Sequence, residues 1–160
     1  TRFVIPAANR KRYDQLELML AEFPELNGKV TLLEGQSRQA MTVSNVVLVN
    51  SGTATLEAML LRKPMVMSYR VGKITYAIVS RLVTTQWFAL PNILAGRSIV
   101  PEFIQDAAVP SVMASEVRRL LDEKEASDVI TTFDEIHQLL KKSVAPGAEA
   151  AKAVLGLCEH

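Results

Sequence analysis

The residues best suited to bind an anion lie directly after a strongly apolar run at 46–49. They are small and polar and lead into a segment with helical spacing: Asn50-Ser51-Gly52-Thr53-Ala54-Thr55-Leu56-Glu57. Gly52 permits close approach of backbone to a ligand. The N–H groups of Gly52, Thr53 and Ala54 would point at an anion, supported by the helix dipole and by the Ser51 and Thr53 hydroxyls. A phosphate cradle and an ordinary Ser/Thr-capped helix start explain this segment equally well.

Glu57 adds a second chemical feature to this segment. It follows Thr53 by one helical turn, so both side chains can lie on one face of the helix. A carboxylate there could accept hydrogen bonds from the vicinal hydroxyls of a ribose, as an acid does from another position in dinucleotide folds. The alternative is a first-turn acid that caps the helix or stabilises its dipole. The phosphate-binding N–H groups and a ribose-binding Glu57 together would form a nucleotide diphosphate site.

The charge of the chain is unevenly distributed. The 160 residues carry a formal net charge of +1, which argues against a nucleic-acid partner. From Ala58 to Pro101, however, there is no acid, while six basic residues are present: Arg62, Lys63, Arg70, Lys73, Arg81 and Arg97. The rest of the chain is therefore acidic. A base-only stretch indicates an anionic ligand or surface, unless it is a solvated helix face.

The order of apolar and turn-forming segments predicts an α/β fold with a parallel sheet and helices on both faces. Strands are expected at 3–5, 30–33, 46–49 and 64–69, and helices at 10–22, 37–43, 54–61, 74–83, 111–121, 125–142 and 149–157. Asn9 is a suitable N-cap for the first helix. We expect a single domain, 1–160, with a nucleotide-binding core at 1–70, a basic loop and helical region at 71–145 and a C-terminal helix at 146–160.

Composition excludes several classes of protein. Hydrophobic residues make up 49% of the chain, as in globular domains. The single cysteine, Cys158, excludes an internal disulfide framework and a four-cysteine zinc site. Neither His137 nor His160 lies near a cysteine pair, so no metal site is expected. The chain opens on Thr1 rather than methionine, which suggests a piece of a longer protein.

Several motifs occur together with specific spacing. The segment 51–60 precedes Pro64-Met65-Val66 and Tyr69-Arg70, and further on stand Leu90-Pro91-Asn92-Ile93-Leu94-Ala95-Gly96-Arg97, Pro101-Glu102 and Gln105. With these motifs the whole chain resembles the lipid-A-disaccharide synthase family. The S-G-T-A-x-L-E element is shared loosely with other GT-B glycosyltransferases, whereas the L-P-N-x-L-A-G-R element is much more selective.

The resemblance implies a fold and a reaction. The chain would be most of the C-terminal, Rossmann-like half of a GT-B fold, with its first strand and the following Gly-Ser-Arg loop missing and with a helical C-terminal tail. The family's inverting enzyme joins UDP-2,3-diacylglucosamine to 2,3-diacylglucosamine 1-phosphate (lipid X), giving lipid A disaccharide and UDP. The UDP-sugar is a substrate, and neither a cofactor nor a metal is expected.

The resemblance also implies roles for individual residues. Glu57 would hold the ribose, Asn92 would sit in the UDP-sugar site, and the diphosphate would meet Gly52, Thr53 and Ala54. Ser51 and Arg97 match further positions of the same site. No catalytic residue is expected here, because the base and the acceptor site would belong to a missing N-terminal domain. The fragment alone would be inactive, and its lost strand would leave an open edge or apolar faces that favour a homo-oligomer.

A membrane contact is a further expectation. Because both substrates carry acyl chains, we expect a cytoplasmic protein, peripheral on the anionic inner membrane of a Gram-negative bacterium. Basic and aromatic residues suited to that contact are Lys73, Tyr76, Arg81, Trp87 and Phe88. The alternative is that these apolar side chains belong to the core or to a domain interface.

Two other functions remain open. The chain could be a non-catalytic Rossmann-like module that binds a nucleotide or a membrane surface. It could also belong to a different UDP-sugar enzyme of the GT-B fold, although the segment Leu90–Arg97 argues against that.

Overall fold

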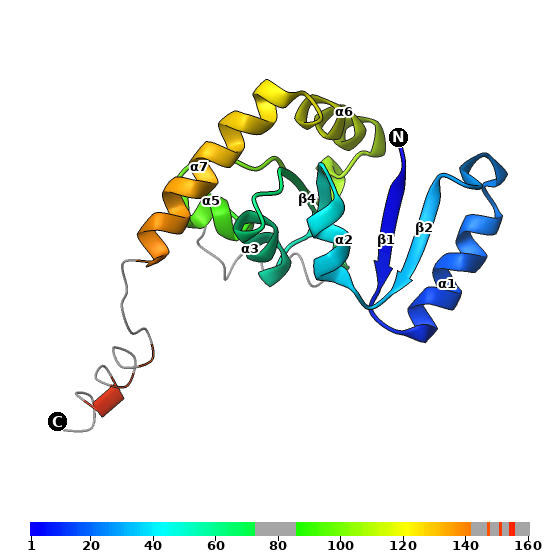
Figure 1. Ribbon diagram of the computed structural model, residues 1–160, viewed down its shortest axis with the longest axis horizontal. Coiled ribbons are helices and arrows are strands. Elements are labelled where there is room, and N and C mark those ends of the chain that lie inside the picture. Colours follow the sequence, from blue (N-terminus) through cyan, green and yellow to red (C-terminus); the bar gives the residue numbers. More distant parts are fainter. Residues whose placement is uncertain (73–85, 142–146, 148–150, 152–153, 156–160) are drawn as a thin grey trace.

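The computed structural model describes residues 1–72, 86–141, 147, 151 and 154–155 (Figure 1). Its elements are, in chain order, β1 (Phe3–Ala7), α1 (Arg10–Ala21), η1 (Pro24–Leu26), β2 (Val30–Glu34), α2 (Ser37–Val43), β3 (Val47–Asn50), α3 (Thr53–Leu60), β4 (Met65–Tyr69), α5 (Leu90–Ala95), β5 (Glu102–Ile104), η2 (Gln105–Ala107), α6 (Pro110–Leu120) and α7 (Glu123–Lys141). Parallel strands alternating with helices confirm the predicted α/β class, a Rossmann-like half of a GT-B fold.

The strands form two sheets rather than one. In the first sheet β1 pairs with β2, with Phe3 opposite Val30 and Ala7 opposite Glu34. In the second sheet the order is β3-β4-β5, and Val47 lies opposite Met65. All of these pairings are parallel. The facing edges of β1 and β3 are not hydrogen-bonded to each other, so the sheet is interrupted between them.

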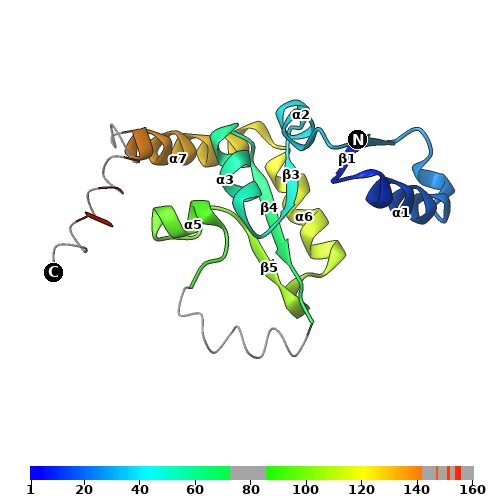
Figure 2. The same cartoon turned by 90° about the horizontal axis from the view of Figure 1, so that it is seen from below.

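The hydrophobic core lies around the second sheet. Its buried residues come from α2, β3, α3, β4, α6 and α7, with Ala89 and Val100 between elements, and include Met59, Met65, Val66, Met67 and Phe133. The first sheet contributes little, since Ala7 is its only residue in the buried core and α1 has no buried residue. In Figure 2 this difference is visible: β1 and α1 lie at one end, away from the helices around β4.

The starts of α1 and α2 differ in how they are capped. Asn9 is the N-cap of α1, and its side chain accepts a hydrogen bond from the Arg12 N–H, which confirms the predicted cap. Helix α2 begins at Ser37, but its N-cap is Gln36 in the left-handed region (φ 57°). Ser37 is therefore the first residue of the helix rather than its cap.

Other sequence predictions need correction or lie outside the described residues. The short strand β5 was not expected, because Pro101 and a run of only 3 residues give little strand signal. The helix expected at 74–83 lies outside the described residues, as does most of the one expected at 149–157. Within the part of the chain that the structure covers, no helix is long and apolar enough to cross a bilayer.

Candidate functional site

The start of α3 stands at the carboxyl end of β3, where parallel sheets bind ligands. Gly52 is its N-cap, with φ 135° and ψ −165°. Residues other than glycine essentially never adopt this backbone conformation. No side chain caps the helix, so the N–H groups of Thr53 and Ala54 are left to solvent or a ligand. A Cβ built on Gly52 would meet no atom within 4 Å, which shows that the space beside the loop is open.

Replacing Gly52 with alanine tests this conformation. The variant is expected to lose about 1–3 kcal/mol of unfolding free energy, because an alanine strains the backbone although its methyl group clashes with nothing. Urea unfolding followed by circular dichroism measures the loss. Gly28→Ala, at φ 70° in a left-handed turn, is a control for ordinary strain and should lose less. Equal stability of Gly52→Ala and the wild type would contradict the assigned conformation.

Two hydroxyl groups join this loop to the segment before α5. The Ser51 Oγ donates to the carbonyl oxygen of Phe88 at 3.3 Å. The Thr55 Oγ1 donates to the carbonyl oxygen of Gly52 at 2.7 Å and accepts from the Leu90 N–H at 3.2 Å. Because the side chain of Thr55 is fully buried, these bonds lie inside the protein. They hold the start of α3 beside the start of α5.

Asn92 is the centre of a second polar cluster. Its Oδ1 accepts from the N–H groups of Ile99 at 2.7 Å and Val100 at 2.8 Å. Its Nδ2 donates to the Val100 carbonyl oxygen at 2.8 Å and to the Glu102 carboxylate at 2.7 Å. Both donors and both lone pairs of the amide are thus used, and Asn92 is 0% exposed. In this structure its side chain organises the loop after α5 and does not face open space.

Glu102, at the start of β5, links this cluster to the residues that precede α5. Its carboxylate accepts the N–H groups of Phe88 and Ala89, each at 2.9 Å, in addition to the Asn92 amide. One carboxylate therefore accepts from two N–H groups just before α5 and from the Asn92 amide within its first turn. Such charge-assisted bonds are stronger than neutral ones. Glu102 joins β5 to α5 and, through Phe88, to Ser51.

The remaining residues expected in the site are exposed. Glu57 lies on α3 one turn after Thr53, and Arg97 follows α5. Among the hydrogen bonds and ion pairs of the described residues, none involves the side chain of Glu57 or Arg97. The structure thus brings Ser51, Gly52 and the Asn92 cluster together through α3 and α5. It leaves Glu57 and Arg97 with their charges in solvent.

The residues expected at a membrane divide into two groups. Lys73, Tyr76 and Arg81 lie outside the described residues. Trp87 and Phe88 are half-buried, and the ring of Phe88 stacks on that of Tyr69 with centroids 6.5 Å apart. Phe88 also packs against the hydrophobic core, which accounts for it without a membrane. A membrane contact stays a prediction.

Sequence reasoning assigned no role to three residues that shape this region. They are Thr55, Glu102 and Gln105. The Oε1 of Gln105 accepts from the Val71 N–H at 2.8 Å, and its Nε2 donates to the Val71 carbonyl oxygen at 3.0 Å. The motif segments contain them, but no local pattern predicts partners that lie far away in the chain. Among the described residues, no group of three or more histidine, cysteine or acidic side chains could hold a metal ion.

Fold and site together define a Rossmann-like α/β protein with an uncapped helix start open at the carboxyl end of β3. A family model described as lipid-A-disaccharide synthetase matches residues 1–154, and the chain belongs to this family. A lipid-A-disaccharide synthase from Pseudomonas aeruginosa is 47% identical over 159 residues, which are 99% of this chain. Similar proteins of the same name come from Alcanivorax borkumensis (44% over 155 residues) and Aeromonas hydrophila (43% over 156 residues).

The chain spans 40% of the length of each of these relatives and 96–99% of its own.

Proposed function

We propose that this chain is the UDP-sugar-binding part of an inverting glycosyltransferase. The whole enzyme would join UDP-2,3-diacylglucosamine to 2,3-diacylglucosamine 1-phosphate and release lipid A disaccharide and UDP. The family match over residues 1–154 carries this proposal. It is supported by the uncapped start of α3, which suits a diphosphate.

The proposed donor site uses the charge that develops on UDP as it leaves. The N–H groups of Thr53 and Ala54, at the positive end of α3, would bind the diphosphate. Such preorganised dipoles stabilise the transition state more than the ground state, because negative charge on the leaving group grows during transfer. Glu57, one turn along α3, would accept hydrogen bonds from the ribose hydroxyls.

Asn92 and Glu102 would act as positioning residues in this site. Their bonds hold the start of α5 against Ser51 and Thr55, beside the proposed diphosphate site. Arg97 lies just beyond α5 and is exposed, so its cation is available to a phosphate or sugar group. The acceptor would bind to the part of the enzyme that this chain does not span. A membrane surface would be met by the basic and aromatic residues Lys73, Tyr76, Arg81, Trp87 and Phe88.

The base that activates the acceptor hydroxyl would lie in the 60% of the enzyme that this chain does not span. The 160 residues alone are therefore expected to bind UDP weakly and to transfer no sugar. The whole enzyme would work in the cytoplasm, on the inner membrane where its acylated substrates reside. A glycosyl-transfer assay that shows full turnover by the isolated chain would contradict this division of roles.

UDP binding tests the proposal directly. Titration of the chain with UDP, followed by backbone amide NMR shifts, is expected to shift the signals of residues 52–57. ADP, with the same diphosphate, should bind more weakly. Glu57→Gln is expected to weaken UDP binding about tenfold or more, since hydrogen bonds to a charged group contribute about 1.5–3 kcal/mol.

Glu135→Gln, at an exposed position of α7 far along the chain, is the matched control and should leave UDP affinity unchanged. Equal affinity for UDP and ADP, together with no effect of Glu57→Gln, would favour a general nucleotide-binding module. Shifts confined to residues outside 50–57 and 88–97 would overturn the assigned site.

A further inference from the structure

Gln105 joins two segments that are far apart in the sequence. Its amide oxygen and its amide nitrogen both bind the backbone of Val71, a residue 34 positions away. The two bonds are partly buried. They lie just beyond the last pair of the β4–β5 ladder, in which Tyr69 is opposite Ile104. The side chain of Gln105 therefore continues the contact between these two strands past the point where the ladder ends.

The Gln105 amide stands where a backbone peptide group would otherwise continue this ladder. Within the ladder, the Met67 N–H donates to the carbonyl oxygen of Pro101 at 2.9 Å. Because a parallel ladder repeats every two residues on both strands, two further repeats would bring the Val71 N–H to the backbone carbonyl of Gln105. That carbonyl instead accepts from the Ala108 N–H at 3.1 Å, in the turn of η2. The side-chain oxygen of Gln105 takes its place as the acceptor for Val71.

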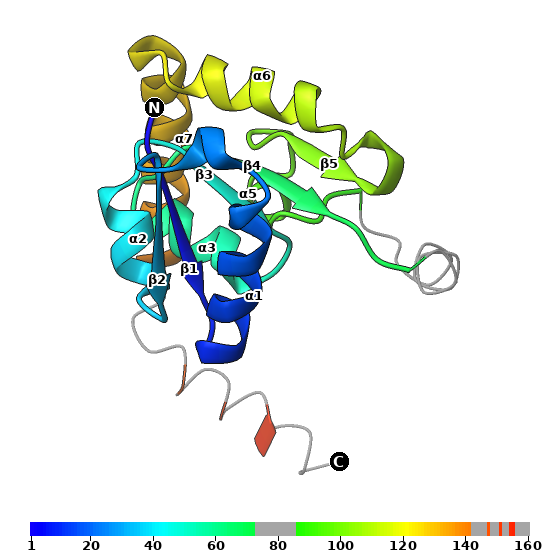
Figure 3. The same cartoon turned by 90° about the vertical axis from the view of Figure 1, so that its right-hand side faces the viewer.

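The backbone conformation of Gln105 explains why a side chain is needed there. Its φ of 53° lies in the left-handed region, which residues other than glycine seldom adopt. The chain turns at this residue from β5 into η2, so the backbone of β5 cannot pair further with β4. Figure 3 shows that the chain beyond β4 nevertheless runs on past the end of β5. Its next two polar backbone groups, those of Val71, are paired by the Gln105 amide alone among the hydrogen bonds of the described residues.

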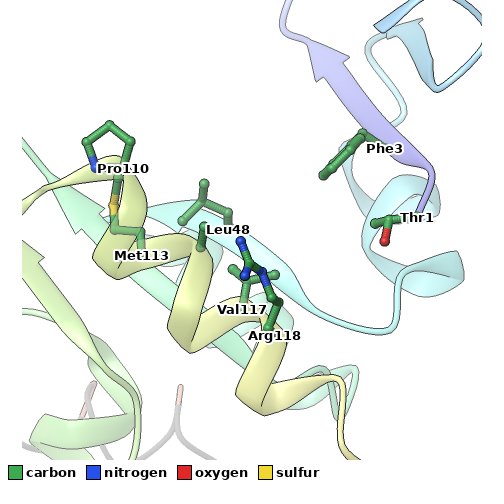
Figure 4. Close-up of a pocket in the computed structure, with 8 residues that line it drawn as sticks. Thr1, Phe3, Leu48, Pro110, Met113, Val117 and Arg118 are labelled. Carbon is green, nitrogen blue, oxygen red and sulfur yellow. The ribbon is translucent and has the colours of Figure 1, made fainter. Parts of the chain in front are cut away.

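The turn that carries Gln105 is held on both sides. Strand β5 before it pairs with β4, and helix α6 after it packs against β4. In Figure 4, α6 begins at Pro110 and carries Met113 and Val117 on its side toward Leu48 of β3. Val117 also packs against the hydrophobic core. Because its own backbone is fixed to the sheet in this way, Gln105 can hold Val71 in place.

Contacts between described residues connect Val71 with the start of α3. Two residues before Val71, the ring of Tyr69 stacks on the ring of Phe88 with centroids 6.5 Å apart. The carbonyl oxygen of Phe88 accepts from the Ser51 Oγ at 3.3 Å. Ser51 directly precedes Gly52, the N-cap of α3. A displacement of Val71 would therefore be felt at the proposed diphosphate site through the two stacked rings.

We infer that Gln105 is a positioning residue of the donor site. Its amide fixes the path of the chain as it leaves β4, which holds the Tyr69 ring against Phe88 and so supports the start of α3. Glu102 holds Phe88 from its other side, by accepting from the Phe88 N–H. Gln105 acts through Val71 and is not expected to touch a substrate. The effect on the donor rests on the proposed function, whereas the effect on Phe88 is independent of it.

Hydrogen exchange of the 160-residue chain without any ligand tests the effect on Phe88. Gln105→Met keeps the length of the side chain and removes both hydrogen bonds to Val71. The Val71 amide is then expected to exchange about tenfold faster or more, and the Phe88 amide about threefold faster or more. Gln138→Met, the same substitution at an exposed position of α7, is the matched control and should change neither rate. Faster exchange at Val71 alone, or at neither residue, would overturn the inference.

A second variant separates positioning from general stability. Gln105→Gly also removes the amide, but glycine adopts a φ of 53° without strain, so the turn between β5 and α6 is kept. Both variants are expected to speed exchange more at Phe88 than at Phe133, whose amide lies in the buried core of α7 and reports on unfolding of the whole domain. Equal acceleration at Phe88 and Phe133 in both variants would show that Gln105 only adds stability, and would overturn the inference.

UDP titration tests the effect on the donor site, with circular dichroism to verify that each variant is folded. Gln105→Met and Gln105→Gly are expected to bind UDP about threefold to tenfold more weakly, because a displaced helix start loses part of its hydrogen bonding to the diphosphate. Gln138→Met should bind as the unaltered chain does. Unchanged affinity of both Gln105 variants would overturn the positioning role while UDP binding itself stands. Failure of the unaltered chain to bind UDP would contradict the proposed function, and the exchange rate at Phe88 would then decide alone whether Gln105 positions that segment.

Discussion

Replacing Asn92 with leucine is expected to lower the free energy of unfolding by about 3–5 kcal/mol. Leucine is of similar size and fills the site, but it removes all four hydrogen bonds of the amide. The N–H groups of Ile99 and Val100 would then lack a partner, and each such buried group costs about 1–3 kcal/mol. The Glu102 carboxylate would lose one of its three donors and keep the N–H groups of Phe88 and Ala89. Domains are stable by only about 5–15 kcal/mol, so a large part of the population unfolds at modest urea concentrations.

Asn45→Leu is the matched control for this variant. Asn45 is exposed, and its replacement is expected to change stability by less than about 0.5 kcal/mol. Asn92→Asp separates hydrogen bonding from size: it keeps the acceptor for Ile99 and Val100 but sets two carboxylates side by side, so it should also destabilise. If urea midpoints of Asn92→Leu and Asn45→Leu agree, the cluster around Asn92 contributes little to stability.

Truncating Phe133 to alanine is expected to lower the free energy of unfolding by about 3–5 kcal/mol. Phe133 is fully buried on α7, in the core cluster that also contains Met59 and Met67. Helix α7 packs against both α3 and α5, the helices whose starts border the proposed donor site. The cavity left by the ring would therefore loosen the support beneath that site as well as the core.

Leu139→Ala, on the same helix but 62% exposed, is the control and is expected to cost less than about 0.5 kcal/mol. Thermal and urea unfolding of the two variants measure the difference. A loss below about 1.5 kcal/mol for Phe133→Ala would show that the core closes around the missing ring, in which case the support of α3 and α5 by α7 is weaker than the packing indicates.

The local elements of the fold were largely predictable. Strands β1 to β4 and helices α1 and α3 begin within a residue or two of their expected positions, because apolar runs, Asn9 and Gly52 are local signals. Strand β5 was missed because it is 3 residues long and owes its conformation to pairing with β4. The interruption between β1 and β3 had no local signal, since strand order is a property of pairing between distant segments.

The candidate site was predictable only in part. The sequence placed Gly52 and Thr53 at a helix start, and α3 begins at Thr53. It did not foresee that Thr55 binds Leu90, 35 residues away, or that Asn92 binds Glu102, 10 residues away. Hydrogen bonds at such separations depend on how helices and strands pack, which spacing along the chain does not encode.

By itself the sequence determined the α/β class, the glycine at the start of α3 and, through its motifs, the family. These follow from local backbone preferences and from residues in fixed order, which do not depend on packing. The tertiary structure alone decided that the Asn92 amide is buried among protein partners and that the strands form two sheets, with β1 and β3 not paired to each other. Both result from burial and strand pairing between segments far apart in the chain, which only the folded molecule brings together.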